Sequence, residues 1–320
     1  MRASGLFLSS VLVMLLGLSS SARQDRAVTP LVNPDGEINI FAMNDRGQVV
    51  GEMRTAVEDI THAFLWARGV LQDLGTLEGD ILSIATAVND SGQVAGVSLS
   101  DTTLRPFLWS NGVMTDLGSL GGGFAEATGM NNRGQVVGGS ATANGDFHAF
   151  VWWKGGMQDL GGTNSLAFAI NSRGQIVGSS LTASGSFHAT LWQDGQIYDL
   201  GTLGGESSGA FGINDRGQIV GFSDTDTGDT RVFLWEDGIM SALPVPAGDY
   251  SQCEAGSITN RGQIAGTCFT RDGFAAAFIW DNGIVTPVAP SAESSAASTI
   301  NNRGDIAGDL FPIGAVVWSK

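Results

Sequence analysis

A single motif recurs seven times along this chain of 320 residues and limits its fold more than any other feature. In its most regular form the motif reads Ile-Asn-x-Arg-Gly-Gln, followed by Ile or Val. Its first glycine stands, at intervals of 40 to 45 residues, at Gly47, Gly92, Gly134, Gly174, Gly217, Gly262 and Gly304. A second motif ends in tryptophan and follows each time, at Trp66, Trp109, Trp152, Trp192, Trp235, Trp280 and Trp318. Self-similarity at this period predicts one supersecondary unit that packs on copies of itself.

Each repeat is expected to contain four short strands. In the third repeat these are 125–130, 135–140, 148–152 and 157–160. The Asn-x-Arg-Gly segment fits a type I turn between the first two strands, and pairs such as Arg68-Gly69 fit a two-residue hairpin turn between the last two. The 46 glycines and the near absence of lysine agree with short strands and tight turns. Four antiparallel strands per repeat of this length are typical of a β-propeller blade.

The two ends of the repeat region predict how the ring closes. The last repeat stops after its third strand, at Trp318, and lacks a fourth. The segment Val28-Thr29-Pro30-Leu31 precedes Asn44 by the same sixteen residues that separate Val285-Thr286-Pro287-Val288 from Asn301. We therefore predict an all-β, seven-bladed propeller in which residues 27–32 complete the last blade. Residues 23–320 then form one domain, with repeats near 28–77, 78–120, 121–162, 163–203, 204–245, 246–290 and 291–320.

The N-terminal residues and the net charge restrict location and partners. Arg2, an apolar run over 6–18 and a small-residue site at 20–22 predict a signal peptide spanning residues 1–22. We expect a monomer secreted to the periplasm or the extracellular space, with no membrane span. The formal net charge of −16 argues against nucleic acid as a partner. An extracellular protein or glycan is the expected partner, and no cofactor is expected.

One position, at the start of the third strand, is basic in five repeats: His62, Arg105, His148, His188 and Arg231. Such a ring could bind an anion or take part in acid–base chemistry. However, an aspartate eleven residues later lies within reach across the predicted hairpin in four repeats: Asp73, Asp116, Asp159 and Asp199. Where the base is absent, at Ala276 and Gly314, the acid is absent too. This covariation favours structural pairs and leaves Arg231, which faces Ala242, as the unpaired base and the leading binding candidate.

Other candidates are weaker. Three carboxylates in one loop, Asp224, Asp226 and Asp229, could hold Ca²⁺, although their spacing is not an established calcium-loop pattern and a solvated loop is favoured. Trp153 lies one residue beyond the repeated tryptophan and is a binding candidate. The turn after the first strand of each repeat carries a second set of basic residues: Arg46, Arg133, Arg173, Arg216, Arg261 and Arg303. These arginines could form an anion-binding face, but we favour the interpretation that they belong to a turn sequence repeated in each blade.

Cys253 and Cys268 flank the first turn of the sixth repeat almost symmetrically. In an oxidising compartment they are candidates for a cross-strand disulfide. A register slip of one residue would place the two side chains on opposite faces of the sheet, so the sequence leaves the bond open.

The His-Ala-Phe-Leu-Trp run at 62–66 resembles the HAF family of extracellular repeat proteins, as do Ile-Asn-Asp-Arg-Gly at 213–217 and Asp-Leu-Gly-Thr-Leu-Gly-Gly at 199–205. The resemblance implies a bacterial, exported repeat protein and carries no biochemical activity. We interpret the chain as a non-catalytic protein- or glycan-binding module or scaffold. The alternative is a carbohydrate-active enzyme, a polysaccharide lyase or hydrolase, with catalytic candidates Arg231, His148, His188, Tyr198 and Tyr250.

Overall fold

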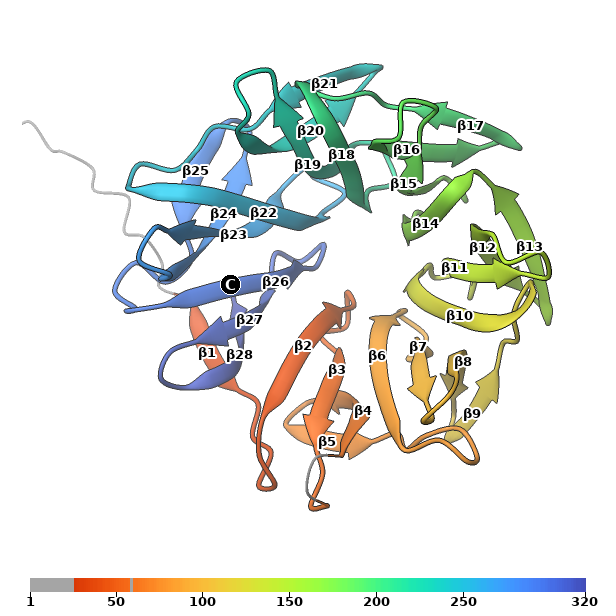
Figure 1. The fold of residues 1–320 in the computed structure, drawn as a ribbon. Helices are drawn as coiled ribbons and strands as arrows, with labels where there is room; N and C mark the ends of the chain where they lie inside the picture. The colour runs from red at the N-terminus through yellow and green to blue at the C-terminus, as the bar shows by residue number, and fades with distance from the viewer. Residues whose placement is uncertain (1–25, 58–59) are drawn as a thin grey trace, which may run out of the picture.

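The computed structural model describes residues 26–57 and 60–320, and these form seven four-stranded antiparallel sheets arranged around a central axis (Figure 1). The protein is therefore a seven-bladed β-propeller, as the repeat predicts. In blades one to six the four strands follow one another in chain order, from the innermost to the outermost. The predicted signal peptide, residues 1–22, lies outside the described residues. Within the described ranges no helix is long and apolar enough to cross a membrane.

The strands of each blade keep the predicted order. Blade one contains β2 (Ile38–Met43), β3 (Val49–Arg54), β4 (Thr61–Ala67) and β5 (Val70–Asp73). Blade two contains β6 (Leu82–Val88), β7 (Val94–Leu99), β8 (Leu104–Ser110) and β9 (Val113–Asp116). Blade three contains β10 (Gly121–Met130), β11 (Val136–Thr142), β12 (Phe147–Trp153) and β13 (Gly156–Gly161). Blade four contains β14 (Thr163–Ile170), β15 (Ile176–Leu181), β16 (Phe187–Gln193) and β17 (Gln196–Asp199).

The later blades follow the same plan. Blade five contains β18 (Gly204–Ile213), β19 (Ile219–Thr225), β20 (Thr230–Glu236) and β21 (Ile239–Ala242). Blade six contains β22 (Tyr250–Ile258), β23 (Ile264–Thr270), β24 (Ala275–Asp281) and β25 (Ile284–Pro287). Blade seven combines β26 (Ser295–Ile300), β27 (Ile306–Leu310) and β28 (Gly314–Ser319) with β1 (Ala27–Pro30).

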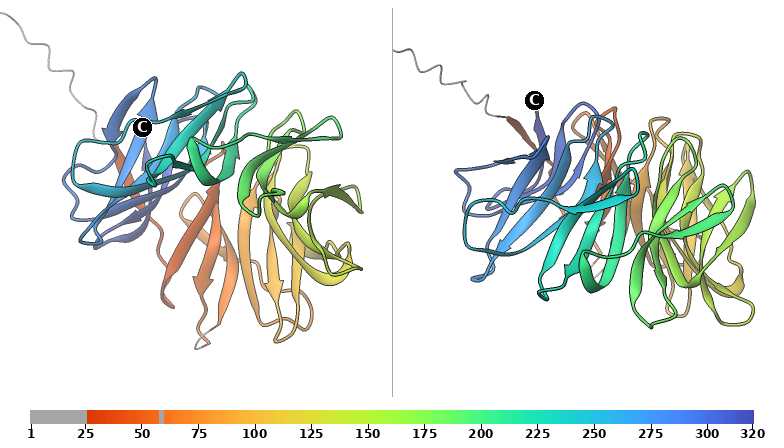
Figure 2. Two further views of the ribbon diagram at one scale, coloured as in Figure 1. Left: turned by 45° about the horizontal axis from the view of Figure 1, so that its top comes forward. Right: turned by 90° about the horizontal axis from the view of Figure 1, so that it is seen from above.

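The N-terminal strand closes the ring, which confirms the prediction for residues 27–32. β1 pairs antiparallel with β28, with Val28 opposite Trp318, and Leu31 continues the pairing through a hydrogen bond to Ala315. The two strands lie side by side in every view (Figures 1 and 2). This pairing gives the outer edge of β28 a partner and joins the two ends of the repeat region.

The turns give the molecule two distinct faces. Asn44 begins the turn between β2 and β3, where the Gly47 N–H donates to the Asn44 carbonyl oxygen and Gly47 has a φ of +76°. Arg68 and Gly69, both with positive φ, form the two-residue turn between β4 and β5. We call the face that carries these turns the turn face. The opposite face carries the longer loops, such as 31–37 and 74–81, and we call it the loop face.

The core lies between neighbouring blades. Five of the repeated tryptophans are buried: Trp66, Trp109, Trp192, Trp280 and Trp318. Trp152 and Trp235 are partly buried against the same interblade clusters. Their position agrees with the packing role expected from the repeat, since large aromatic side chains contribute most of the buried apolar area.

The two cysteines form a disulfide within blade six. Cys253 and Cys268 are directly opposite each other on β22 and β23 and are bonded across the sheet. The register that the sequence left open therefore places both side chains on the same face. Both are buried, at 8% and 0% exposure.

Candidate functional site

The three histidines each contact the aspartate of their own repeat. His62 Nδ1 lies 3.0 Å from both carboxylate oxygens of Asp73. The corresponding shortest distances are 2.9 Å for His148 with Asp159 and for His188 with Asp199. Each aspartate also accepts a hydrogen bond from the main-chain N–H two residues later, as Asp73 does from Gly75 at 2.7 Å. The pair thus connects the start of the third strand to the loop that follows the fourth strand. Both the imidazole and the carboxylate therefore have a structural role in the blade.

Arg105 extends the same arrangement to a second aspartate. Its Nη1 lies 3.2 Å from Asp116 Oδ2, while its Nη2 lies 2.9 Å from Asp80 Oδ1. The Asp80 side chain is only 2% exposed, so the arginine neutralises a buried carboxylate of the preceding loop. The hydrogen bond to Asp80 outweighs burial and raises the pKa of Arg105.

The structure corrects the interpretation of Arg231 as an unpaired base. Its Nη2 lies 3.0 Å from Asp229 Oδ2, two residues earlier in the chain. Ala242, the residue across the hairpin, offers no charge, and the partner comes instead from the loop that precedes β20. Arg231 therefore has a carboxylate partner like the other bases in this position.

The three aspartates of the calcium candidate are not gathered around one point in this structure. Asp229 contacts Arg231, and Asp224 Oδ1 accepts a hydrogen bond from the Thr230 hydroxyl at 2.8 Å. In the described part of the chain, no three acidic, histidine or cysteine side chains are grouped so that they could hold a metal ion. The three carboxylates of this loop are separated by these contacts and do not converge.

The remaining candidates do not form one site. Arg231 and Tyr250 line the same small pocket between blades five and six, where the Tyr250 ring packs edge-on against Phe278 at 5.3 Å. Tyr198 is exposed on β17 of blade four. Trp153 is 48% exposed at the end of β12, and Lys154 Nζ lies 4.3 Å from its ring centre. The candidates are thus distributed over four of the blades.

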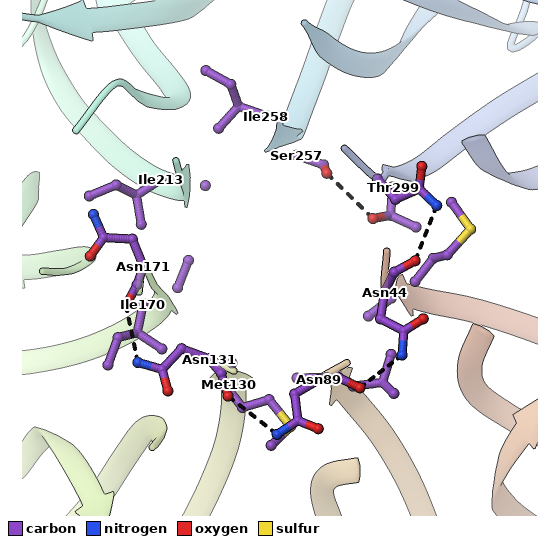
Figure 3. A pocket seen from close by; sticks show the side chains of 18 of the residues that line it. Asn44, Asn89, Met130, Asn131, Ile170, Asn171, Ile213, Ser257, Ile258 and Thr299 are labelled. Atoms are coloured by element: carbon purple, nitrogen blue, oxygen red, sulfur yellow. Dashed lines mark hydrogen bonds between the residues drawn. The ribbon is translucent and has the colours of Figure 1, made fainter. Parts of the chain in front are cut away.

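A ring of asparagine side chains surrounds the central cavity, which has a volume of about 350 Å³ (Figure 3). The Asn44 side-chain amide donates to the main-chain oxygen of Asn89 at 2.8 Å, and this bond recurs around the ring. Thr259 replaces the asparagine in blade six and cannot donate to blade seven in this way. Sequence reasoning assigned these asparagines to turns and missed their role between blades.

The residues that follow the asparagines form a second ring on the turn face. The main-chain N–H of Asp45 donates to Asp90 Oδ1, and that of Asp215 donates to Asn260 Oδ1. Burial alone would raise the pKa of Asp215, but hydrogen bonds from Ser172 and Asn260 and the charge of Arg173 lower it below its ordinary value. The carboxylates of this second ring therefore form contacts between blades. This agrees with the interpretation of the arginines in the same turns as part of a repeated turn sequence.

A hollow on the loop face was not anticipated from the sequence. A groove of about 700 Å³ runs between the loops 31–37, 55–57 and 80–81, and we call it the loop-face groove. Its rim is formed by exposed apolar side chains, with Val32 at 70%, Val57 at 59% and Ile81 at 48% exposure. The His62–Asp73 pair lines it as well. An exposed apolar rim around paired polar groups is typical of a docking surface.

The comparisons with known proteins agree with the fold. No family model matches the chain, and no curated protein matches its sequence. The structure is similar to puromycin hydrolase, with a TM-score of 0.61 and 14% identity over 86% of this chain and 50% of that chain. It is similar to the β-propeller domain of the Trilobed protease from Pyrococcus furiosus, with a TM-score of 0.60 and 10% identity over 88% and 94%. It is also similar to TolB from Acinetobacter baumannii, with a TM-score of 0.53 and 15% identity over 79% and 65%.

The likeness is one of fold. At these identities the shared feature is the propeller, and propellers carry binding as well as catalytic sites. The chain spans only about half the length of the puromycin hydrolase, so that protein's activity does not transfer. The Pyrococcus propeller is described as having an open velcro topology, whereas here β1 pairs with β28 and closes the ring.

Proposed function

We propose that this chain is a secreted, non-catalytic binding module that holds an extended polypeptide segment of a partner protein in the loop-face groove. The observation that carries the proposal is the groove itself. Val32, Val57 and Ile81 expose large apolar side chains around this one hollow, whereas exposed side chains such as Val70, Ile239 and Ile284 do not line it. Isolated apolar side chains on a surface need no explanation, but several around one hollow favour an interaction site.

The occupied state of the reactive groups favours binding over catalysis. His62, His148 and His188 each contact an aspartate, and Arg105 and Arg231 each contact a carboxylate. These contacts give each aspartate, and Nδ1 of each histidine, a role within its own blade. The enzyme alternative is supported chiefly by the small pocket that Arg231 and Tyr250 share.

Charge indicates the chemistry of the partner. Asp35, Asp73 and Asp80 line the groove together with Arg54 and His62, and Arg105 neutralises Asp80. The whole chain carries a formal charge of −16. A partner segment with alternating aliphatic and basic side chains would match the apolar rim of the groove and the negative charge of the whole chain. This complementarity favours a polypeptide over a neutral glycan, which would need exposed aromatic platforms.

Location follows the same proposal. The apolar run at 6–18 and the resemblance to the HAF repeat proteins support export, and a disulfide between Cys253 and Cys268 suits an oxidising compartment. We infer a protein that acts as a monomer in the periplasm or outside the cell.

A peptide-binding measurement tests the function. The probe is a fluorescein-labelled heptapeptide of alternating leucine and lysine, acetylated and amidated at its ends, and the readout is fluorescence anisotropy. We expect Ile81→Ser to weaken binding about fivefold, because part of an apolar contact is lost. Ile239→Ser is the matched control, since Ile239 is 67% exposed at the start of β21, next to the turn face. Equal binding by all three proteins would show attraction by charge alone and would contradict the proposal.

A second measurement tests the enzyme alternative. The purified protein is incubated with uronate-containing and neutral polysaccharides, and products are followed by ultraviolet absorbance and by reducing ends. We expect no release of product. Turnover that is abolished in Arg231→Gln would overturn the non-catalytic assignment and favour the pocket between blades five and six.

A further inference from the structure

A serine hydroxyl joins neighbouring blades at four of the seven seams. Ser83 Oγ accepts a hydrogen bond from the Ala63 N–H at 2.8 Å and donates to the Gly75 carbonyl oxygen at 2.6 Å. The same acceptor role recurs for the main-chain N–H groups of Ala149, Ala189 and Ala277, which donate to Ser165, Ser208 and Ser295. In each repeat the serine stands six residues before the turn-forming asparagine. The hydroxyl thus satisfies an N–H at the loop-face end of the preceding blade.

The exception at blade two agrees with this role of the serine. Pro106 occupies the position of Ala63 and has no N–H to donate. Ala125, rather than serine, stands at the corresponding position of the next blade. Donor and acceptor are therefore absent together.

At the seam between blades seven and one the acceptor alone is absent. Ala315 in blade seven corresponds to Ala63 in blade one. Ala315 is opposite Asp309 on β27, and Ala63 is opposite Glu52 on β3. Ile38 stands where the serine would be, six residues before Asn44. The Ala315 N–H therefore lacks the hydroxyl acceptor that is found at four seams, as does the Val232 N–H at the seam between blades five and six, where Cys253 occupies the serine position.

A pocket of about 460 Å³ lies at this seam, and we call it the seam pocket. Leu31, Ile38 and Ala315 form buried parts of its wall, while Ile313 is 53% exposed at its edge. Val32 and Asn33 line both the seam pocket and the loop-face groove, so the two hollows adjoin.

Asp309 supplies a carboxylate to the seam pocket. It is half-buried, and among the described residues no hydrogen bond or ion pair reaches its carboxylate. Burial raises the pKa of Asp309 above its ordinary value. Glu37 is the other acidic residue that lines the pocket. A bound cation would compensate a carboxylate in this position.

We propose that the seam pocket binds the free amino terminus of a polypeptide whose first side chain is aliphatic. The α-ammonium group contacts Asp309, the carbonyl oxygen of the same residue accepts a hydrogen bond from the Ala315 N–H, and the side chain packs against Leu31 and Ile38. Asp309 and Ala315 are opposite each other on adjacent antiparallel strands, about 5 Å apart at Cα, so one residue can reach both. The inference rests on the proposed function, because the partner segment would then continue past Val32 into the loop-face groove.

A titration with L-leucinamide tests this site. Methyl resonances of Ile38, Ile313 and Leu31 are followed by NMR in the purified protein. We expect saturable shifts at these methyl groups, and we expect N-acetyl-L-leucinamide, which has no ammonium group, to bind at least about tenfold more weakly. Free L-leucine should also bind more weakly than its amide, since its carboxylate is repelled by Glu37.

Three variants separate the contacts. Asp309→Asn should weaken L-leucinamide at least about tenfold, whereas Asp272→Asn, an equal change of charge on an exposed loop-face residue, should leave it unchanged. Ile38→Ser restores the hydroxyl acceptor for the Ala315 N–H and should weaken the ligand as well. The methyl spectrum itself reports whether each variant is folded.

Equal affinity for the acetylated and free amides, or for Asp309→Asn and the unaltered protein, would overturn the inference. The heptapeptide that tests the proposed function is acetylated and does not require the seam pocket. If it binds in an Ile81-dependent manner while L-leucinamide shows no saturable shift, the seam-pocket inference fails and the proposed function stands. If neither binds, both fail.

Discussion

The side-chain amide of Asn301 in blade seven donates to the main-chain oxygen of Asn44 in blade one at 3.1 Å, although 257 residues separate them. Asn301 Oδ1 also accepts hydrogen bonds from the N–H groups of Arg303 and Asp305. One side chain therefore closes its own turn and also joins the last blade to the first. The ring is therefore closed in two places: by the pairing of β1 with β28 at its outer edge, and by this contact near its central axis.

Replacing Asn301 tests the inner closure. Asn301→Ala leaves buried N–H groups without their acceptor and should lower the free energy of unfolding by about 2 kcal/mol. Urea denaturation provides the measurement. Gln252→Ala, an exposed change on β22, is the control and should stay within about 0.5 kcal/mol of the unaltered protein. A loss no larger than that of the control would contradict a closing role for Asn301.

Completing the asparagine ring should stabilise the protein. Thr259 is buried at the asparagine position, and its hydroxyl accepts from the Gln263 N–H at 3.1 Å. Thr259→Asn keeps an acceptor there and adds an amide that can donate to blade seven. We expect a gain of about 1 kcal/mol in the free energy of unfolding, measured by the same denaturation. A lower stability would indicate that the seam between blades six and seven is closed to the longer side chain.

The disulfide should stabilise blade six against unfolding. Cys253 and Cys268 are 15 residues apart, and a bond that closes such a loop contributes about 3 kcal/mol. The double variant Cys253→Ala, Cys268→Ala should lose about this much. Dithiothreitol should lower the melting temperature of the unaltered protein but leave that of the double variant unchanged, and a shift in both would point to another cause.

Asp215 should stabilise the fold at neutral pH and lose this effect in acid. Its pKa is lower in the folded state than in the unfolded state, so its contribution is complete above the unfolded-state pKa of about 3.9. It disappears as the pH falls through the lower folded-state value. The destabilisation caused by Asp215→Asn should therefore be larger at pH 7 than at pH 3. Equal losses at the two pH values would contradict this linkage.

Glu126 should behave in the opposite sense. Burial raises the pKa of Glu126 in the folded state, so its ionised form lowers stability at pH 7. This penalty is relieved as the pH falls through the raised folded-state pKa toward the unfolded-state value of about 4.3. Glu126→Gln should be more stable than the unaltered protein at pH 7, and the difference should shrink by pH 4. A difference that grew in acid would reverse the assignment.

Much of the blade could be predicted because its contacts are local. A period of two along each strand and a two-residue turn place His62 beside Asp73, and the loss of both partners in later repeats shows that they act together. The same reasoning predicted that residues 27–32 complete blade seven. It failed for Arg231 because its partner Asp229 lies in the loop before β20, where no strand register constrains the side chains.

The sequence by itself determined the number of blades, their strands and the strand that closes the ring, since each depends on repeat spacing and hairpin register. Only the tertiary structure decided which residues act between blades. Asn301 meets Asn44, and Ile38 leaves the Ala315 N–H without a serine, only because ring closure brings blades seven and one together. The loop-face groove likewise depends on how three loops from neighbouring blades pack, which repeat spacing does not specify.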